Sequence, residues 1–421
     1  MATFRFLHCA DLHLDSPLRG LEADPDAPAE TIRGATREAL KNLVNFAIGE
    51  RVDFVVAAGD LYDGDWQDWR TGHFLTGEIA RLTKAGIPFI AIRGNHDAES
   101  VITRRLVMPG ANARWLDHRR PETYRLPHLP VSIHGQSFAT KAVTDNIAMT
   151  YPPPDPGRFN IGLLHSSVGE REGHDTYASC SVEQLRDHGY QYWALGHVHK
   201  ADILNRDPWI VFPGNLQGRK ITETGPKGAS LVTVTDDIVS VASVIFDTVR
   251  WARIDIVLTA DADEDAALAQ MRGALGTELE RAEGRLLAVR IVLSGGCAAH
   301  DTFSRDFGAA REKVRNAAIA VAGPGMIWIE TVSVATAPLP RTGGGAEQHA
   351  ATGQLVQALL ETDGQDIAKD IRDYATEMLG KTNPLRQAIG SEHPACAVGE
   401  DEGLSELVRR ARDLLLGTLA G

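Results

Sequence analysis

The chain has 421 residues, a formal net charge of −13 and 43% hydrophobic residues, which suits two compact domains and excludes extensive disorder. The acidic balance argues against a protein that holds nucleic acid by bulk positive charge, although a site built on metal cations would still accept a phosphate. The four cysteines are widely scattered, and no apolar stretch is long enough to cross a bilayer. These features predict a cytoplasmic protein that makes no membrane contact.

Strands alternate with helices over the first part of the chain. Apolar runs predict strands at residues 4–9, 53–58, 87–92, 131–133, 159–164, 190–195 and 209–212, and helical spacing predicts helices around 40–47 and 74–84. A hairpin is expected where residues 231–234 and 238–246 flank the turn at Asp236-Asp237. Because most of these strands are apolar throughout, we expect sheets that are buried on both faces.

The pattern changes near residue 250. Strands at 254–258, 286–293 and 326–334 alternate with helices at 264–281 and 303–321, which predicts a small βαβαβ cap. A Gly343-Gly344-Gly345 linker follows, and apolar residues at helical spacing predict a helical tail beyond it. We therefore expect three parts, at residues 1–250, 251–340 and 341–421.

Side chains of the types that bind metals follow five of the predicted strands. In chain order they are Asp11 with His13, then Asp60, Asn95, His165, and His197 with His199. Ligands of an open α/β sheet bind beyond the carboxyl ends of its strands, so these side chains are predicted to converge on one rim. Each motif alone is often structural, but the ordered set of five favours a functional site.

Carboxylate, amide and imidazole ligands suit two divalent cations. Manganese is the expected ion, with magnesium, iron and zinc as alternatives, and Asp60 is the natural bridge between two sites. Two metals about 3.5–4 Å apart can activate a shared hydroxide and clamp a phosphoryl oxygen, which is the chemistry of phosphoester hydrolysis. His96 is predicted to protonate the leaving oxygen, with Asp97 orienting its imidazole.

The motifs that carry a family resemblance cover about half of the chain. They are Asp11-Leu12-His13, Gly59-Asp60-Leu61-Tyr62-Asp63, Gly94-Asn95-His96-Asp97, His165 and Gly196-His197-Val198-His199. Together they resemble the calcineurin-like metallophosphoesterases, and within that group the DNA repair exonucleases of the SbcD and YhaO type. The resemblance implies an α/β fold, a four-layer αββα sandwich, and His96 as the catalytic histidine.

The resemblance also implies a ligand set for each metal. One ion would be held by Asp11, His13, Asp60 and His199, and the other by Asp60, Asn95, His165 and His197. One position departs from the break-repair nucleases of archaea and eukaryotes, which usually carry a phosphate-positioning histidine where this chain has Asp63. Asp63, Arg93 and Arg219 are the candidate substrate-binding residues.

The leading functional hypothesis is a two-metal phosphodiesterase that hydrolyses DNA. By resemblance it would be an exonuclease of repair and recombination that works with an SbcC-like SMC-type ATPase, for which the helical tail offers a docking element. The alternatives are a phosphomonoesterase, such as a nucleotidase or protein phosphatase, and a non-catalytic scaffold subunit for DNA ends. The sequence leaves a homodimeric assembly open.

Overall fold

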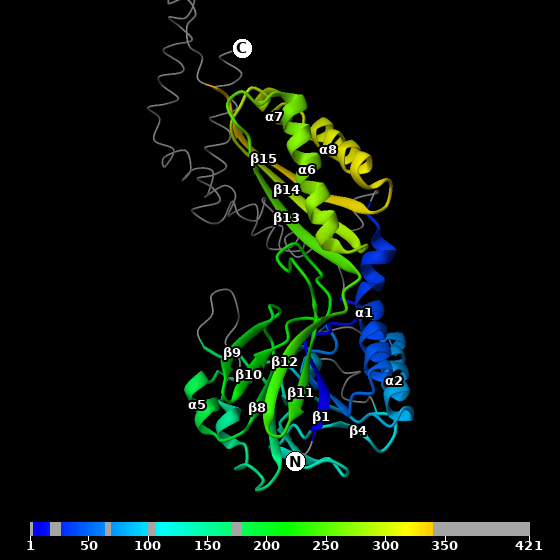
Figure 1. The fold of residues 1–421 in the computed structure, drawn as a ribbon, viewed down its shortest axis with the longest axis vertical. Helices are drawn as coiled ribbons and strands as arrows, with labels where there is room; N and C mark the ends of the chain where they lie inside the picture. Colours follow the sequence, from blue (N-terminus) through cyan, green and yellow to red (C-terminus); the bar gives the residue numbers. More distant parts are fainter. Residues whose placement is uncertain (1–2, 17–26, 64–68, 100–106, 170–178, 340–421) are drawn as a thin grey trace, which may run out of the picture.

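The computed structural model describes residues 3–16, 27–63, 69–99, 107–169 and 179–339 (Figure 1). Their strands form two six-stranded sheets and one three-stranded sheet. None of the helices in these ranges is long and apolar enough to span a membrane. The helical tail predicted at 341–421 lies outside the described residues.

The first sheet has the strand order β12-β11-β1-β2-β3-β4. Its strands are β1 (Thr3–Cys9), β2 (Phe54–Ala58), β3 (Phe89–Ile92), β4 (Ala113–Trp115), β11 (Gly228–Thr235) and β12 (Ile238–Ile245). Strands β1 to β4 run parallel, whereas β11 and β12 form an antiparallel hairpin. The predicted turn is confirmed, because Asp236 and Asp237 adopt φ angles of 51° and 67°, as a tight hairpin turn requires.

The second sheet has the order β5-β6-β7-β8-β10-β9, with parallel central strands and antiparallel edges. Its strands are β5 (Glu122–Arg125), β6 (Val131–Gly135), β7 (Phe159–His165), β8 (Tyr192–Gly196), β9 (Asp202–Arg206) and β10 (Trp209–Phe212). The sequence pattern did not mark β4, β5 and β9, because these strands are short and partly exposed.

Helices cover the outer faces of the two sheets, which pack against each other through an apolar core. Helices α1 (Ala29–Gly49) and α2 (Trp69–Lys84) lie on the first sheet, and α5 (Val182–Asp187) and the 3-10 turn η2 (Ile147–Thr150) lie on the second. The short helix α3 (Asn95–Glu99) follows β3. The α/β class with two sheets between helical layers is therefore confirmed.

One buried histidine joins the two sheets beneath the strand ends. The ring nitrogens of His8, on β1, each lie 3.0 Å from an atom of β8, namely the Tyr192 hydroxyl and the Leu195 carbonyl oxygen. Burial lowers the pKa of His8 to about 3, so the ring is neutral and uses one nitrogen as donor and the other as acceptor. These bonds hold β1 and β8 together just before their ligand-bearing ends.

The third sheet is parallel, in the order β13-β14-β15 (Figure 1). Its elements are β13 (Val249–Val257), α6 (Glu264–Ala282), β14 (Leu286–Gly296), α7 (His300–Ser304), α8 (Phe307–Ala322) and β15 (Ile327–Ala337). The prediction of a single helix at 303–321 was wrong. The Asp306 side chain accepts a hydrogen bond from the Ala309 amide at 2.9 Å, and this N-cap starts a new helix.

Helix α1 connects the sandwich to this smaller unit (Figure 1). Ile32 and Ala35, near the start of α1, pack with Trp251 of β13 and Trp328 of β15. The two indole rings meet edge to face with centroids 6.0 Å apart. The cap sheet therefore rests on a helix that also covers the first sheet.

Candidate metal centre

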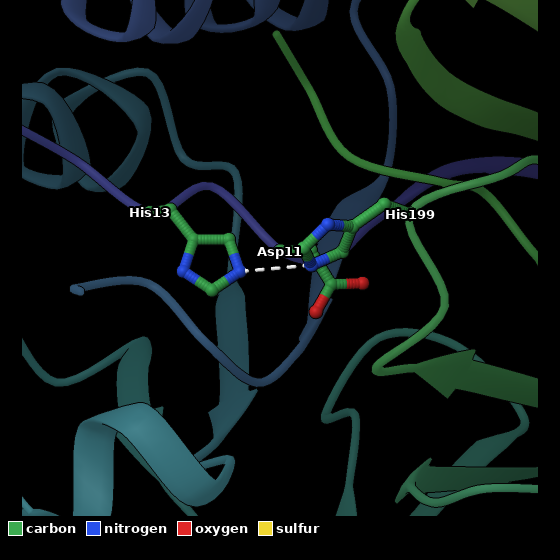
Figure 2. Close-up of side chains that lie close together, drawn as sticks. All are labelled: Asp11, His13 and His199. Carbon is green, nitrogen blue, oxygen red and sulfur yellow. Dashed lines mark hydrogen bonds between the residues drawn. The ribbon is translucent and has the colours of Figure 1, made fainter. Parts of the chain in front are cut away.

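The ligand-type side chains come from the carboxyl ends of strands in both six-stranded sheets. Residues Asp11 and His13 follow β1, Asp60 follows β2, Asn95 follows β3, His165 ends β7, and His197 and His199 follow β8. The structure brings them together at the rim where the two sheets meet. Figure 2 shows the His13 and His199 rings turned toward each other, with the Asp11 carboxylate beside His199.

The backbone at this rim adopts conformations that are rare for residues with a side chain. The φ angles of Asp11, His13, Asp60 and His197 are 52°, 42°, 54° and 103°. Each such residue costs on the order of 1 kcal/mol and persists only where surrounding contacts hold it. Two contacts of this kind are the bonds from the Asp11 and His13 amides to the carbonyls of Gly59 and Asp60, each 3.0 Å long.

Two motif glycines leave room for this convergence. A Cβ atom on Gly94 would lie 2.3 Å from Asp60 Oδ1, and one on Gly196 would lie 1.9 Å from the Ala58 carbonyl oxygen. Both separations are far below van der Waals contact, so no larger residue fits without moving the ligand loops. The glycines therefore set the spacing of the site.

Hydrogen bonds fix the tautomer of two ligand histidines. His199 Nδ1 lies 2.8 Å from the Glu223 carboxylate, and His165 Nδ1 lies 2.8 Å from the Ala58 carbonyl oxygen. Because both partners only accept, Nδ1 carries the proton in each ring and Nε2 presents a lone pair. This is the arrangement in which outer-shell acceptors prepare histidines to bind a metal.

Nε2 of each ring carries a lone pair in the neutral form and points at another ring nitrogen or oxygen. His199 Nε2 is 3.1 Å from His13 Nε2, and burial lowers the pKa of His13 to about 3, so the His13 ring is neutral. His165 Nε2 is 2.9 Å from the Asn95 side-chain oxygen and 3.4 Å from Asp60 Oδ2. Burial alone would lower the pKa of His165, but Asp60 outweighs it and raises this pKa to about 9. A positive charge is therefore favoured between these atoms. A bound cation would supply this charge.

The donor atoms fall into overlapping groups. Three sets place one ligand atom per residue within 4.8 Å of one another: Asp11, His13 and His199; His13, Asp60 and His96; and Asp11, Asp60 and His165. The His197 ring lies beside that of His165, with centroids 5.2 Å apart, and its amide donates to Asp11 at 3.0 Å. Asp11, His13 and Asp60 each belong to two of the sets, so the sets overlap, and together they fit two cations.

Asp63 contacts the histidines instead of pointing away from the rim. Its Oδ1 atom lies 3.0 Å from His96 Nδ1 and 3.6 Å from His13 Nδ1, and Ser16 donates to its other oxygen. Burial opposes the charge of Asp63, yet its contacts with His13, His96 and Arg219 lower its pKa well below the usual range. The anion in turn outweighs the desolvation of His96 and raises the pKa of that imidazole. Asp63 is placed to orient His96.

That role was predicted for Asp97, which the structure places elsewhere. Its buried carboxylate accepts hydrogen bonds from the amides of Leu61, Tyr62 and Gly94 at 3.1, 3.0 and 3.2 Å. Asp97 therefore braces the two loops that carry Asp60 and Asn95. Burial, with the nearby charge of Asp60, raises its pKa to about 7.

The two candidate substrate-binding arginines have different surroundings. The Arg219 guanidinium is 14% exposed and lies 3.4 Å from Asp63 and 3.2 Å from Glu223, so these two carboxylates hold it. The Arg93 guanidinium stacks over the Trp115 ring at 5.0 Å from its centroid. Arg219 thus belongs to the scaffold of the rim, whereas Arg93 lies at its edge.

Glu223 is the residue that sequence reasoning missed. Besides His199, it accepts hydrogen bonds from the Asn215 side chain and the Arg219 amide, each at 2.8 Å. Burial opposes its ionised form, but His199 and Arg219 outweigh this effect and lower its pKa. It lies in a polar loop rather than at a strand end, so strand-based reasoning had no means to find it.

The rim thus defines a metal-binding hydrolase site on a two-sheet α/β fold, and comparisons with known proteins agree. The family model "Calcineurin-like phosphoesterase" matches residues 4–201, and "Metallophosphoesterase YhaO, middle domain" matches residues 251–337. Metallophosphoesterase YhaO of Bacillus subtilis (strain 168) is 34% identical over 69% of this chain and 71% of its own length. The chain belongs to the calcineurin-like metallophosphoesterases, whose fold implies a dimetal centre.

More distant proteins were also matched. The DNA double-strand break repair protein Mre11 of Sulfurisphaera tokodaii is 25% identical over 59% of this chain and 64% of its own. Among solved structures, a dimetal phosphatase from Danio rerio aligns over 56% of this chain and 95% of its own, at 12% identity and a TM-score of 0.35.

The contact between Glu223 and His199 leads to a prediction about metal affinity. Glu223→Ala removes the acceptor that fixes the His199 tautomer, so we expect Mn²⁺ affinity to fall roughly 10- to 100-fold, the usual effect of losing such a partner. Isothermal titration of metal-free protein with Mn²⁺ measures this change. Glu183→Ala, on the exposed surface of α5, is the matched control. Unchanged affinity in Glu223→Ala would remove Glu223 from the metal centre.

Proposed function

We propose that this chain is a two-metal phosphodiesterase that hydrolyses DNA, with manganese as its ion. The observation that carries the proposal is the set of overlapping ligand clusters, two of which share Asp60 and one of which includes His96. Phosphate esters are hydrolysed at sites of this type because two cations offset the charge of both the attacking and the leaving oxygen. A catalytic use of the rim is supported by the exposure of His96, at 35%, beside candidate ligands that are buried except for His199.

Different residues of the chain would bind the metals and donate the proton at such a site. Asp11, His13, Asp60, Asn95, His165, His197 and His199 would hold two cations, which when bound activate a water molecule and polarise a phosphoryl oxygen. Asp63 lies 3.0 Å from His96 Nδ1 and favours the protonated form of the ring, in which Nε2 has a proton to donate. His96 then delivers this proton to the leaving oxygen.

DNA as the substrate is supported by similarity. The matched Mre11 proteins are described as DNA double-strand break repair proteins, and the one from Sulfurisphaera tokodaii is similar over 59% of this chain. More specifically, we propose that the chain is an exonuclease of DNA repair that works with an SbcC-like ATPase. The acidic net charge of −13 is consistent with a partner that supplies part of the grip on DNA.

The substrate class is tested by comparing two small esters. With Mn²⁺ present, we expect the protein to hydrolyse bis-p-nitrophenyl phosphate faster than p-nitrophenyl phosphate, because a diester brings one negative charge to a rim that already holds buried carboxylates. Release of p-nitrophenolate measures both rates. A clear preference for the monoester would replace the proposal with a phosphomonoesterase.

The role of His96 is tested by substitution. His96→Ala should keep two equivalents of Mn²⁺ by elemental analysis while diester cleavage falls by roughly 10²-fold or more, the usual effect of losing a positioned proton donor. Asp63→Ala should lose less activity, because it acts through His96. Loss of a metal equivalent in His96→Ala would instead make His96 a ligand, as its proximity to His13 and Asp60 allows.

The partner proposal concerns residues 341–421, which lie outside the described part of the chain. Deleting them should leave diester hydrolysis unchanged and abolish co-purification with an SbcC-like ATPase, because apolar residues at helical spacing in this segment suit a groove on a partner. Affinity purification of both forms with the co-expressed ATPase tests this. Full recovery of the ATPase by the shortened chain would show that docking occurs elsewhere.

A further inference from the structure

One edge of the first sheet is formed by β12, which pairs only with β11 among the described strands. The eight residues of β12 pair with β11 in a continuous register, without a bulge. Because the two-residue turn at Asp236-Asp237 closes this hairpin, Thr235 and Ile238 form its first hydrogen-bonded pair, and alternate residues of β12 direct their backbone groups away from β11. These residues are Val239, Val241, Ser243 and Ile245. Their amide and carbonyl groups form the outer side of the sheet and are able to pair with another strand.

The side chains of β12 do not protect this edge. The strand reads Ile-Val-Ser-Val-Ala-Ser-Val-Ile, without charge, proline or glycine. In a chain with 24% charged residues, the whole run between Asp237 and Asp247 carries none. Ile238 is 75% exposed and Ile245 is 36% exposed, so both ends of the strand present a large apolar side chain to solvent. Long, regular and uncharged edges of this kind favour pairing with a further strand.

The other three edges of the two six-stranded sheets are protected by the usual means. Strands β4 and β5 have three and four residues, and they carry Arg114 on one edge and Glu122 and Arg125 on the other. Strand β9 begins at Asp202 and ends at Arg206, and its register with β10 is interrupted by an irregularity. Short length, charge and irregular register each discourage pairing between edges. Only β12 lacks all three among these four edges, which indicates that its outer side is used.

Self-pairing of β12 is compatible with its charge and its apolar pattern. When two identical edges pair antiparallel, a two-fold axis passes through the middle of the strand, here at Val241 and Ala242. Because β12 has no charged residue, no like charges face each other across the new ladder. The exposed Ile238 comes to lie beside the Val244–Ile245 end of the second copy, so each isoleucine gains apolar contacts. One pairing uses both open edges, so the assembly closes as a dimer.

We propose that β12 is the surface through which two copies of this chain form a dimer, joined by an antiparallel ladder between their first sheets. The inference goes beyond the phosphodiesterase function and does not depend on it. In the sheet order, β11 separates β12 from β1, so the pairing uses none of the candidate metal ligands. A single ladder of eight residues is small beside standard protein interfaces, so the dimer is expected to dissociate reversibly on dilution.

The test is sedimentation velocity of the full chain across a dilution series. The parent should change from a dimer to a monomer of 45.6 kDa as it is diluted. Ala242→Lys, at an exposed position next to the axis, brings two like charges together and should be monomeric at concentrations where the parent is dimeric. Val257→Lys adds the same charge to β13 at a position that is 71% exposed, and it should dimerise like the parent. Circular dichroism checks that each variant keeps the parental fold.

A charge swap tests the two-fold arrangement itself. Ala242→Glu should also be monomeric alone, whereas an equal mixture of Ala242→Lys and Ala242→Glu should form dimers again, because opposite charges then meet at the axis. A parent that stays monomeric at every concentration overturns the proposal. So does a dimer that folded Ala242→Lys leaves intact or that Val257→Lys weakens equally, because the interface would then lie elsewhere. A mixture that remains monomeric overturns the two-fold pairing of β12.

Discussion

The structure depends on keeping three carboxylates buried at one rim. Asp11, Asp60 and Asp97 are each at most 2% exposed, and an unpaired buried charge is far too costly to persist. Backbone amides satisfy all three: His197 donates to Asp11, His96 donates to Asp60, and three amides donate to Asp97. The left-handed turns and motif glycines follow from this need, because they let the loops approach closely enough for these bonds.

The imidazoles of the rim are held close to one another and to the Asn95 amide. His199 and His165 are fixed with Nε2 facing His13 and Asn95, and the raised pKa of His165 shows that positive charge is favoured there. A cation that binds these buried nitrogen and oxygen atoms in the folded chain, and not in the unfolded chain, shifts the equilibrium toward the folded state. Metal binding should therefore stabilise the fold as well as equip the site.

The convergence of the candidate ligands was predictable from the sequence because each follows an apolar strand, and parallel strands in one sheet end at one edge. The acid beside His96 was not predictable. Asp97 is the neighbour of His96 in sequence, but consecutive residues of a helix point in different directions. Asp63 reaches His96 from the loop after β2, which only the tertiary structure reveals. The break between α7 and α8 was hidden because Asp306 lies within the predicted helix at 303–321, and only its bond to the Ala309 amide identifies it as a cap.

The loop that carries Glu223 connects the cap sheet to the metal centre. On one side, Glu223 of the loop at residues 215–223 lies 2.8 Å from His199 Nδ1. On its other side, the Gln217 side chain donates to the Val249 carbonyl at 2.7 Å, and the Trp251 indole donates to the Gly218 carbonyl at 2.9 Å. Both Val249 and Trp251 belong to β13, the first strand of the cap sheet. The orientation of His199 therefore depends on a unit that contributes no ligand, because one loop is bonded to both.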